Sequence, residues 1–410
     1  RVAHAQGKRR SAKQLYLRAT AQAPAFTSGH AAYLELLLAG RRFEGMRSIL
    51  EILRSRYTRG LPTRLQALEG RMLMARNKDE AARKVFRKAL DRDPGANHVA
   101  LDLAECLWRK LKKPEEGYLL LEQVYRRAKS LTRAVQLIAE YHFERREVAR
   151  GLQRFTDAAK VNKSLALVRA RTEFLLRHPT PTRLKLAESL LDPMLKKNSR
   201  DHSAVALLAL VALGRRNEKL AKKRIKRALI LRPEHVPYLR YEAKILAQTG
   251  DPRKAIEIYD KLLKAQPQDK SLLVARTRIL CRYRDKRCLA GAKKLLKLGP
   301  SAEGYILEGQ AYLQKRRGAR AIKAFRKAIK LDRQHAGATF LLGRTLYDEA
   351  SFRKAISTLR RGLELTDESA PQFSDIHYFL GMAYAKVKSQ RLARTHLKKY
   401  LGTPGNPQNP

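Results

Sequence analysis

Small and large apolar residues alternate along this chain in a pattern that returns at a fixed interval. The clearest copy begins at His202, and its anchor residues are Ala209, Ala221, Ile225, Ala228 and Pro233. Each anchor has a counterpart 34 residues later, at Ala243, Ala255, Tyr259, Leu262 and Pro267. The residues between the anchors are mostly Ala, Leu, Lys, Arg and Glu, which favour helices. The proline ends the second helix of each copy, because it cannot continue the backbone hydrogen-bond ladder.

The same columns return in three copies near the C-terminal end and in one near the start. The anchors are Gly309, Ala321, Phe325 and Ala328; Gly343, Ala355, Leu359 and Gly362; Gly381, Ala393, Leu397 and Tyr400; and Gly70, Ala82, Phe86, Ala89 and Pro94. Two small-residue columns, one large apolar column and a terminal proline at one period form a specific signal. Any one of these features alone would be weak.

This pattern resembles the tetratricopeptide repeat, whose 34-residue unit is a helix–turn–helix. The resemblance implies that the small residue of the first helix and the Ala of the second lie where the two helices cross. The aromatic or branched residue four positions after that Ala is expected to plug the next interface. Proteins of this kind stack their hairpins so that each repeat packs only on its neighbours.

The resemblance implies an all-α, right-handed superhelical solenoid of about twelve hairpins, the first of them incomplete. We expect a partial repeat over residues 1–26, degenerate repeats over 27–201, well-formed repeats over 202–401 and a flexible tail over 402–410. The turn of one repeat is expanded around Cys281 to Cys288, and its second helix, around 292–298, is expected to be short. The first segment resembles a second helix whose partner lies upstream, which is typical of a fragment.

The charge is strongly unbalanced, with 88 Lys and Arg against 38 Asp and Glu and a formal net charge of +50. Such a balance favours acidic partners: nucleic acid, an anionic membrane surface or an acidic protein. The alternative is a solvated outer surface without a specific partner, because the basic residues are spread over nearly every predicted helix.

The chain has three cysteines, Cys106, Cys281 and Cys288. An odd count without paired spacing argues against a disulfide framework and favours a reducing compartment. Cys281 and Cys288 have no further Cys or His at metal spacing, so we predict no zinc site. The longest apolar run, residues 203–213, is too short to cross a bilayer.

No catalytic motif is found along the chain. It has no glycine-rich phosphate loop, no His-Glu-x-x-His motif and no nucleophile elbow. The ten histidines are scattered, and each is better explained as a surface or interface residue than as a ligand. We therefore predict a protein that is not an enzyme and that needs no cofactor or metal.

The resemblance also implies a concave groove lined by positions 2, 5, 9, 12 and 13 of each first helix. Consecutive first helices place four cations there, which form a basic groove stripe suited to an acidic segment: Arg240, Lys244, Arg278 and Arg282. Ordinary solvated charge is the alternative. The clamp of chaperone-binding relatives is absent, because Ala275 and Glu303 stand where Asn and Lys are needed.

The last three repeats carry apolar residues at the groove positions. These residues predict a partner-binding groove for an amphipathic helix or a compact apolar patch: Ile306, Leu313, Phe340, Tyr347, Tyr378, Phe379 and Met382. The alternative is that some of them tighten the packing between repeats.

The second helices carry much of the excess charge on the outer face of the array. A predicted basic convex face includes Lys222, Lys223, Lys226 and Arg227. Phosphate backbones suit such a face, and binding there would depend strongly on salt. Base-stacking aromatics are not interleaved with these cations, unlike in most single-strand binders.

The leading hypothesis is a cytoplasmic, prokaryotic scaffold for protein–protein interaction, or a periplasmic one if a signal peptide precedes the chain. Family resemblance suggests bacterial secretion, pilus, motility or polarity assemblies, with a partner such as a small GTPase. A basic nucleic-acid-binding solenoid and a regulatory domain of a larger enzyme, such as a kinase, are the alternatives. No membrane insertion is expected.

Overall fold

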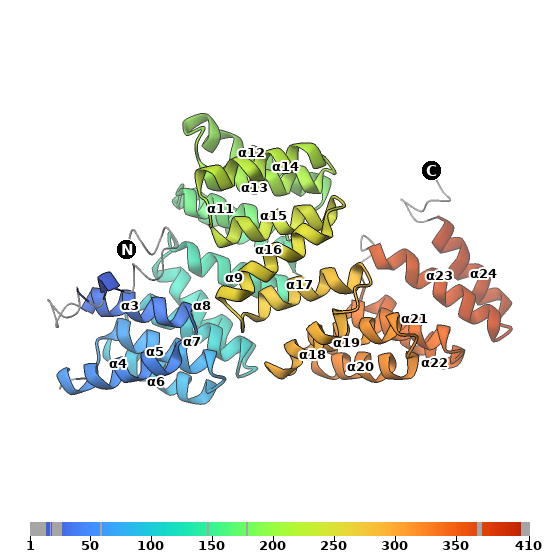
Figure 1. Cartoon of the computed structure of the whole chain (residues 1–410), viewed down its shortest axis with the longest axis horizontal. Coiled ribbons are helices and arrows are strands. Elements are labelled where there is room, and N and C mark those ends of the chain that lie inside the picture. Colours follow the sequence, from blue (N-terminus) through green and yellow to red (C-terminus); the bar gives the residue numbers. More distant parts are fainter. Residues whose placement is uncertain are drawn as a thin grey trace. The chain divides into compact units, whose positions relative to one another are not determined.

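The computed structural model describes residues 14–16, 18, 27–57, 60–145, 147–177, 179–366 and 371–402. Every regular element longer than four residues within these ranges is an α-helix (Figure 1). The predicted all-α fold of stacked helix hairpins is therefore confirmed. The chain divides into two compact units, Arg1–Ile245 and Leu246–Pro410, and the division falls inside α15 (Val236–Gln248). The predicted flexible tail, apart from Gly402, and nearly all of the partial first repeat lie outside the described residues.

From residue 27 onwards, the described part of the first unit contains six consecutive hairpins. Their helices are α3 (Thr27–Ala39), α4 (Phe43–Arg56), α5 (Thr63–Ala75), α6 (Asp79–Arg92), α7 (Asn97–Arg109), α8 (Pro114–Arg127), α9 (Thr132–Glu144), α10 (Val148–Val161), α11 (Leu165–Leu175), α12 (Pro181–Lys197), α13 (His202–Gly214) and α14 (Glu218–Leu231). In the four hairpins from α3 to α10, each first helix has 13 residues and each second helix has 14 residues. The helix lengths are therefore regular from α3 to α10, whereas α11 has 11 residues and α12 has 17.

The second unit continues the same alternation. Its helices are α16 (Pro252–Ala265), α17 (Lys270–Arg282), α18 (Cys288–Lys297), α19 (Ala302–Gln314), α20 (Gly318–Leu331), α21 (Ala336–Asp348), α22 (Phe352–Glu364), α23 (Pro371–Lys386) and α24 (Gln390–Leu401). The helix α18 has 10 residues and is short, as predicted, although it begins at Cys288 and not near residue 292.

A three-residue turn joins the two helices of most hairpins. Its middle residue has a left-handed backbone, as at Asn77 (φ 58°), Arg316 (φ 54°) and Gly250 (φ 89°). The turn satisfies carbonyls at the end of the first helix, since Arg317 N donates to Tyr312 O at 2.9 Å. This is the hydrogen bond expected of a Schellman-type cap. The free energy gained from this hydrogen bond offsets the cost of about 1 kcal/mol that a residue with a side chain incurs in the left-handed backbone conformation.

The two helices of a hairpin cross at the small residue of the first helix. A methyl group added at Gly343 would lie 2.6 Å from Leu359 Cγ, and one added at Gly381 would lie 2.7 Å from Leu397 Cγ. A methyl group at Gly309 would overlap the buried Phe325 ring. The large residue therefore packs against the small residue of its own hairpin, and not only against the next interface as we expected.

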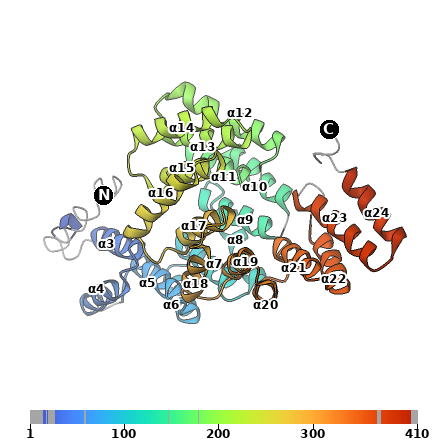
Figure 2. The ribbon, with the colours of Figure 1, turned by 45° about the vertical axis from the view of Figure 1, so that its right-hand side comes forward.

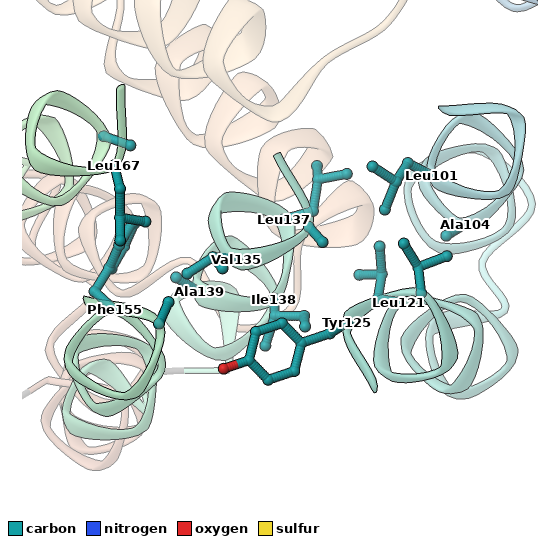
Figure 3. Close-up of a cluster of buried hydrophobic side chains, with 14 of the residues drawn as sticks. Leu101, Ala104, Leu121, Tyr125, Val135, Leu137, Ile138, Ala139, Phe155 and Leu167 are labelled. Carbon is teal, nitrogen blue, oxygen red and sulfur yellow. The ribbon is translucent and has the colours of Figure 1, made fainter. Parts of the chain in front are cut away.

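The degenerate repeats of the first unit are packed as well as the regular ones. A single cluster of buried side chains runs from α7 to α11 (Figure 3). Leu101, Leu121, Ile138 and Phe155 are each no more than 1% exposed. The drift in anchor spacing is accommodated because different large residues fill the same kind of interface.

We predict that Gly309→Ala destabilises the second unit by about 1–3 kcal/mol, because overpacking displaces Phe325. A second change, Phe325→Ile, should recover part of the loss, since α13 and α14 pair Ala209 with Ile225 at the same positions. Urea unfolding followed by circular dichroism measures both variants. Additive destabilisation in the double variant would contradict the predicted contact.

The last hairpin contains a histidine pair. His377 Nδ1 and His396 Nδ1 are 2.8 Å apart, so one nitrogen donates and the other accepts, which requires the accepting ring to be neutral. The Tyr384 ring stacks on His396, with ring centroids 5.5 Å apart. Burial, together with His396 and Lys399, lowers the pKa of His377 to about 4, and its side chain is 1% exposed. Protonation of this pair therefore opposes folding.

We predict that acidification destabilises this hairpin. A histidine whose folded-state pKa lies below its unfolded value of about 6.5 contributes full stability above pH 6.5, and that stability is lost as the pH falls towards 4. The loss should be roughly 2 kcal/mol at pH 5. Thermal unfolding at pH 7 and pH 5 measures it, with His377→Asn expected to reduce the difference and His335→Asn, at the N-cap of α21, as the control. An unchanged difference in His377→Asn would refute the assignment.

Candidate functional site

A cavity of about 670 Å³ lies in the second unit along the first helices α17, α19 and α21, which follow one another in Figure 2. Its lining residues are Arg278, Cys281, Arg282, Arg284, Gln310, Leu313, Gln314, Leu341, Arg344 and Asp348. Most of them occupy positions 9, 12 and 13 of three successive repeats. These positions of three successive first helices therefore line one cavity.

The cavity wall is predominantly cationic. It contains four guanidinium groups and one carboxylate. Arg278 forms an ion pair with Glu303, 2.9 Å away, and Arg344 lies 3.9 Å from Asp348. The Arg344 guanidinium also lies over the Phe379 ring, 5.4 Å from its centre. An arginine that is stacked on an aromatic ring is held in place, which prepares it for two-point contact with a carboxylate or a phosphate.

Arg282 and Arg284 come from the end of α17 and the turn that follows it. Arg284 has a left-handed backbone, with φ of 56°, which turns the chain towards α18. Arg282 lies beside the Tyr283 ring, 5.9 Å from its centre. Two more groove positions carry amides, Gln310 and Gln314, and Gln314 Nε2 donates to Cys281 O at 2.5 Å. Cations and amides together provide hydrogen-bond donors for an anionic ligand.

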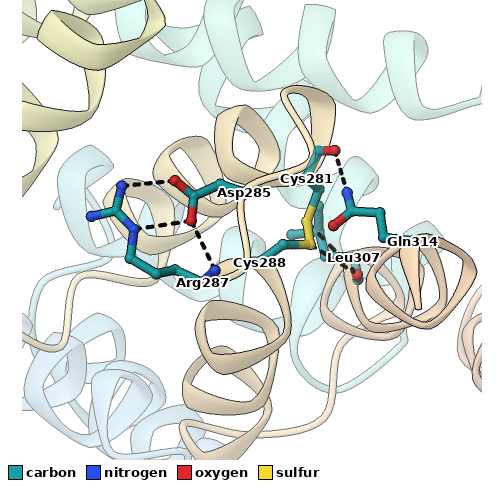
Figure 4. The surroundings of a disulfide bond; sticks show 6 residues. All are labelled: Cys281, Asp285, Arg287, Cys288, Leu307 and Gln314. Atoms are coloured by element: carbon teal, nitrogen blue, oxygen red, sulfur yellow. Dashed lines mark hydrogen bonds and ion pairs between the residues drawn. A yellow bond between two sulfur atoms is a disulfide. The ribbon is translucent and has the colours of Figure 1, made fainter.

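A disulfide lies beneath this turn and joins Cys281 to Cys288 (Figure 4). Both cysteines are buried, and their sulfur atoms lie 3.8 and 3.9 Å from Leu307 O. Asp285 in the same turn accepts hydrogen bonds from Arg287, which lower the pKa of its carboxyl group to about 2. The disulfide and this ion pair hold the turn that carries Arg282 and Arg284.

Our prediction that the cysteines form no disulfide is therefore wrong for Cys281 and Cys288. The physical reason is the expanded turn: α17 ends at Arg282 and α18 begins at Cys288, which brings the two Cα atoms to 4.9 Å. The reducing compartment, which we inferred from unpaired cysteines, loses its basis. Cys106 is a free, buried thiol.

A thiol count tests the disulfide. We predict one reactive thiol in the chain unfolded with guanidinium under non-reducing conditions, and three after reduction. The native chain should react slowly, because burial raises the pKa of Cys106 to about 11 and keeps it protonated. Three thiols without reductant would show that Cys281 and Cys288 are not joined.

The predicted apolar groove is largely a packing layer. Ile306 is 6% exposed and Phe340 is 8% exposed, so our expectation that they are open to a partner is wrong. Position 5 of the repeat packs between neighbouring helices, and both residues belong to the core. Leu313 alone of the seven predicted residues lines the cavity.

The remaining aromatics of that set pack on one another. Tyr347 contacts Phe379, with ring centroids 5.7 Å apart, and Phe379 contacts Phe340 at 6.0 Å. Tyr378 is 37% exposed and lies 5.2 Å from the Tyr400 ring, while Met382 is half-buried. Tyr378 is therefore the most accessible of the predicted apolar residues.

The predicted basic groove stripe is divided between the two units. Arg240 and Lys244 belong to the first unit, where Arg240 is half-buried and Lys244 exposed. Arg278 and Arg282 belong to the second unit, are exposed and line the cavity. The sequence analysis did not single out Arg344, Gln310 and Gln314. All three occupy positions 9 or 13 of their repeats, so the rule for groove positions could have identified them.

The groove of the first unit has a different electrostatic character, because its charges are paired across successive first helices. Asp102 on α7, only 2% exposed, accepts from Arg71 of α5 and Arg133 of α9, each at 2.6 Å. Arg169 of α11 pairs with Asp201, which precedes α13, at 3.0 Å. Arg71, Arg133 and Arg169 are thus neutralised by the chain itself.

The predicted basic convex face lies on α14. Lys223, Lys226 and Arg227 are exposed, and Lys222 is half-buried. Arg227 Nη2 donates to Ser199 O at 2.9 Å, which fixes its stem against the preceding turn. The face presents cations to solvent, and its use remains a prediction.

Comparisons with known proteins agree with this architecture. The sequence model of the tetratricopeptide repeat matches residues 68–130, 206–270 and 306–370. The APC/C hetero-tetramer Cut9–Hcn1 has a similar fold, with a TM-score of 0.53 and 15% identity over 99% of this chain and 86% of that chain. A human IFIT1 dimer with PPP-AAAA has a TM-score of 0.51 and 16% identity over 80% of each chain. MamA has 26% identity over 39% of this chain and 93% of its own, with a TM-score of 0.35.

The chain is a tetratricopeptide repeat protein. Its fold is that of a protein–protein interaction scaffold, in which successive first helices line a groove. No curated protein matches the chain. Within the described ranges, no helix is long and apolar enough to cross a membrane.

Proposed function

We propose that the chain is a non-enzymatic scaffold of a multiprotein assembly, and that the groove of the second unit binds an acidic segment of a partner protein. The observation that carries the proposal is the cavity lined by Arg278, Arg282, Arg284 and Arg344 with one carboxylate in its wall. Carboxylates of Asp, Glu or a chain terminus match the planar guanidinium fork.

The groove supports an extended or helical segment more than a compact apolar patch. Its apolar lining is limited to residues such as Leu313 and Leu341, while the large aromatics beside it are packed against one another. Apolar contact at Leu313 adds affinity, and the cations select the charge of the ligand. In this proposal, charge contributes more to partner binding than apolar contact does. The sequence suggested the opposite, because it favoured an apolar groove.

Glu303 acts as an internal competitor for the ligand. Its carboxylate accepts from both Nε and Nη2 of Arg278, at 3.3 and 2.9 Å. A partner carboxylate must displace it or share the guanidinium with it. The pair is exposed on the Arg278 side, so its own contribution to stability is small.

The test uses the full chain and a fluorescein-labelled hexaglutamate peptide, with binding followed by fluorescence anisotropy. We predict that Arg282→Ala with Arg344→Ala weakens binding at least about tenfold, since each charge-assisted hydrogen bond contributes about 1.5–3 kcal/mol. Glu303→Gln should tighten binding several-fold, because it releases Arg278.

The control variant is Arg326→Ala with Lys327→Ala, which removes two exposed cations from α20. It should change hexaglutamate affinity less than twofold. If the control weakens binding as much as the groove variant, the peptide follows net charge and the groove proposal fails. Circular dichroism of each variant checks that helicity is retained.

A further inference from the structure

The outer helices of the second unit share a register. The buried residues Ala321, Phe325 and Ala328 of α20 correspond to Ala355, Leu359 and Gly362 of α22. In α24 the corresponding buried anchor is Ala393, and in α18 the corresponding face is formed by Cys288, Gly291, Ala292 and Leu295. The four helices can therefore be compared position by position.

Two adjacent positions of this register carry a cation in every one of the four helices. The first column consists of Lys293, Arg326, Arg360 and Lys398, and the second of Lys294, Lys327, Arg361 and Lys399. All eight side chains are exposed. They follow the large residue of α20, α22 and α24, and they follow Ala292 in α18. Lys327 also lies over the Tyr305 ring of α19, 5.4 Å from its centre. In Figure 1, α18, α20 and α22 run along one edge of the second unit, beneath α19 and α21.

The columns are not neutralised by neighbouring acids on their own helices. The helices α18, α20 and α24 contain no Asp or Glu, and α22 contains only Glu364, at its last position. Among the residues that the structure describes, no carboxylate forms an ion pair with Arg326, Lys327, Arg360 or Arg361. The positive charge of these columns faces solvent.

In the second helices that precede α18, the same two positions carry acidic as well as basic residues. They hold an acid in five helices: Glu51 of α4, Glu122 of α8, Asp157 of α10, Asp192 of α12 and Asp260 of α16. Cations fill both positions only in α6, with Arg87 and Lys88, and in α14, with Lys226 and Arg227. The excess charge is thus not a uniform coating, because it is ordered into columns over four consecutive outer helices.

We propose that these two columns form a second binding surface, which contacts the phosphodiester backbone of a double-stranded nucleic acid. Each outer helix packs on the first helices beside it, about 8–10 Å away, so the four outer helices extend the columns over roughly 30–60 Å. One turn of a duplex is about 34 Å long, and its phosphates follow one another along such a path. Arg and Lys columns match this repeating charge without reading sequence.

Side chains around the columns favour a duplex over a single strand. The aromatic Phe325 of α20 is fully buried, and Tyr305, over which Lys327 lies, is half-buried, as are Phe352 and Tyr400. None of these rings offers an exposed stacking platform beside the cations. Single-strand binders combine cations with exposed aromatics. The apolar faces of α20 and α22 are turned inwards, which leaves no continuous apolar face for insertion into a lipid surface.

The test measures binding of the full chain to a labelled 24-base-pair duplex of arbitrary sequence by fluorescence anisotropy over a range of salt concentrations. The duplex is used as DNA and as RNA, which separates the two sources of the same backbone chemistry. The outer variant is Arg326→Glu, Lys327→Glu, Arg360→Glu and Arg361→Glu. We expect it to lose at least about tenfold in affinity at 100 mM salt and to flatten the slope of log K against log salt by about 2–4.

The matched control reverses four exposed cations on two outer helices of the first unit, α6 and α8: Arg87→Glu, Lys88→Glu, Arg126→Glu and Arg127→Glu. It changes the net charge equally, and Arg127 and Arg361 each donate to a backbone carbonyl of the preceding turn. We expect its affinity to stay within about threefold of the parent chain. An equal loss in the control would overturn the proposal, because net charge would then suffice.

Two other results would also overturn it. One is the absence of duplex binding at 100 mM salt. The other is binding to vesicles with phosphatidylserine that depends on the columns and exceeds binding to the duplex. The groove variant, Arg282→Ala with Arg344→Ala, should retain duplex binding, so failure of this proposal and failure of the groove proposal are distinguishable.

Discussion

Close crossing of the two helices in each hairpin is the constraint on which the rest of the structure depends. A small residue in the first helix receives a large residue of the second, as at Gly343 and Leu359. This contact fixes the rotation of both helices about their axes. Once the rotation is fixed, positions 9, 12 and 13 of the first helix face the groove, and the residues after the buried large side chain of the second helix face outwards. Function then depends on which residues occupy these outward and inward positions.

The distribution of charge follows from this fixed rotation. In the first unit, carboxylates such as Asp102 meet arginines of the neighbouring helices and neutralise the groove. In the second unit, the groove retains several guanidinium groups around one cavity, and the outer helices carry two cationic columns. The net charge of +50 is therefore distributed over surfaces that differ in whether carboxylates lie beside their cations. An acidic protein segment suits the enclosed groove, while a regular phosphate backbone suits the open columns.

Much of the fold follows from the sequence, because the anchor residues repeat and each has one packing role. The hairpins were expected from columns such as those around Gly309 and Phe325, and the short helix α18 was expected from the expanded turn before it. The site was harder to predict, since groove and core positions adjoin on one helix. Phe340 reads as a groove residue by position, yet the next hairpin covers it.

Two features lay beyond sequence reasoning for a physical reason. The disulfide depends on the path of an expanded turn, which brings Cys281 and Cys288 together although their spacing matches no framework. The neutral groove of the first unit depends on contacts between residues about 31 positions apart, such as Arg71 and Asp102. The family resemblance predicts which helices carry the paired residues. It does not predict the side-chain conformations that bring their charged groups together.

Site-specific photo-crosslinking tests the central claim most directly. Benzoylphenylalanine placed at Leu313 reports on the groove, and the same group at the exposed Leu331 reports on the outer face. After irradiation in nuclease-treated lysate, mass spectrometry identifies the crosslinked peptides, with hexaglutamate as competitor. The account predicts that position 313 captures a protein segment rich in Asp and Glu, that hexaglutamate prevents the capture, and that position 331 does not capture it. Capture at position 331 alone, or capture at 313 that hexaglutamate does not affect, would contradict it.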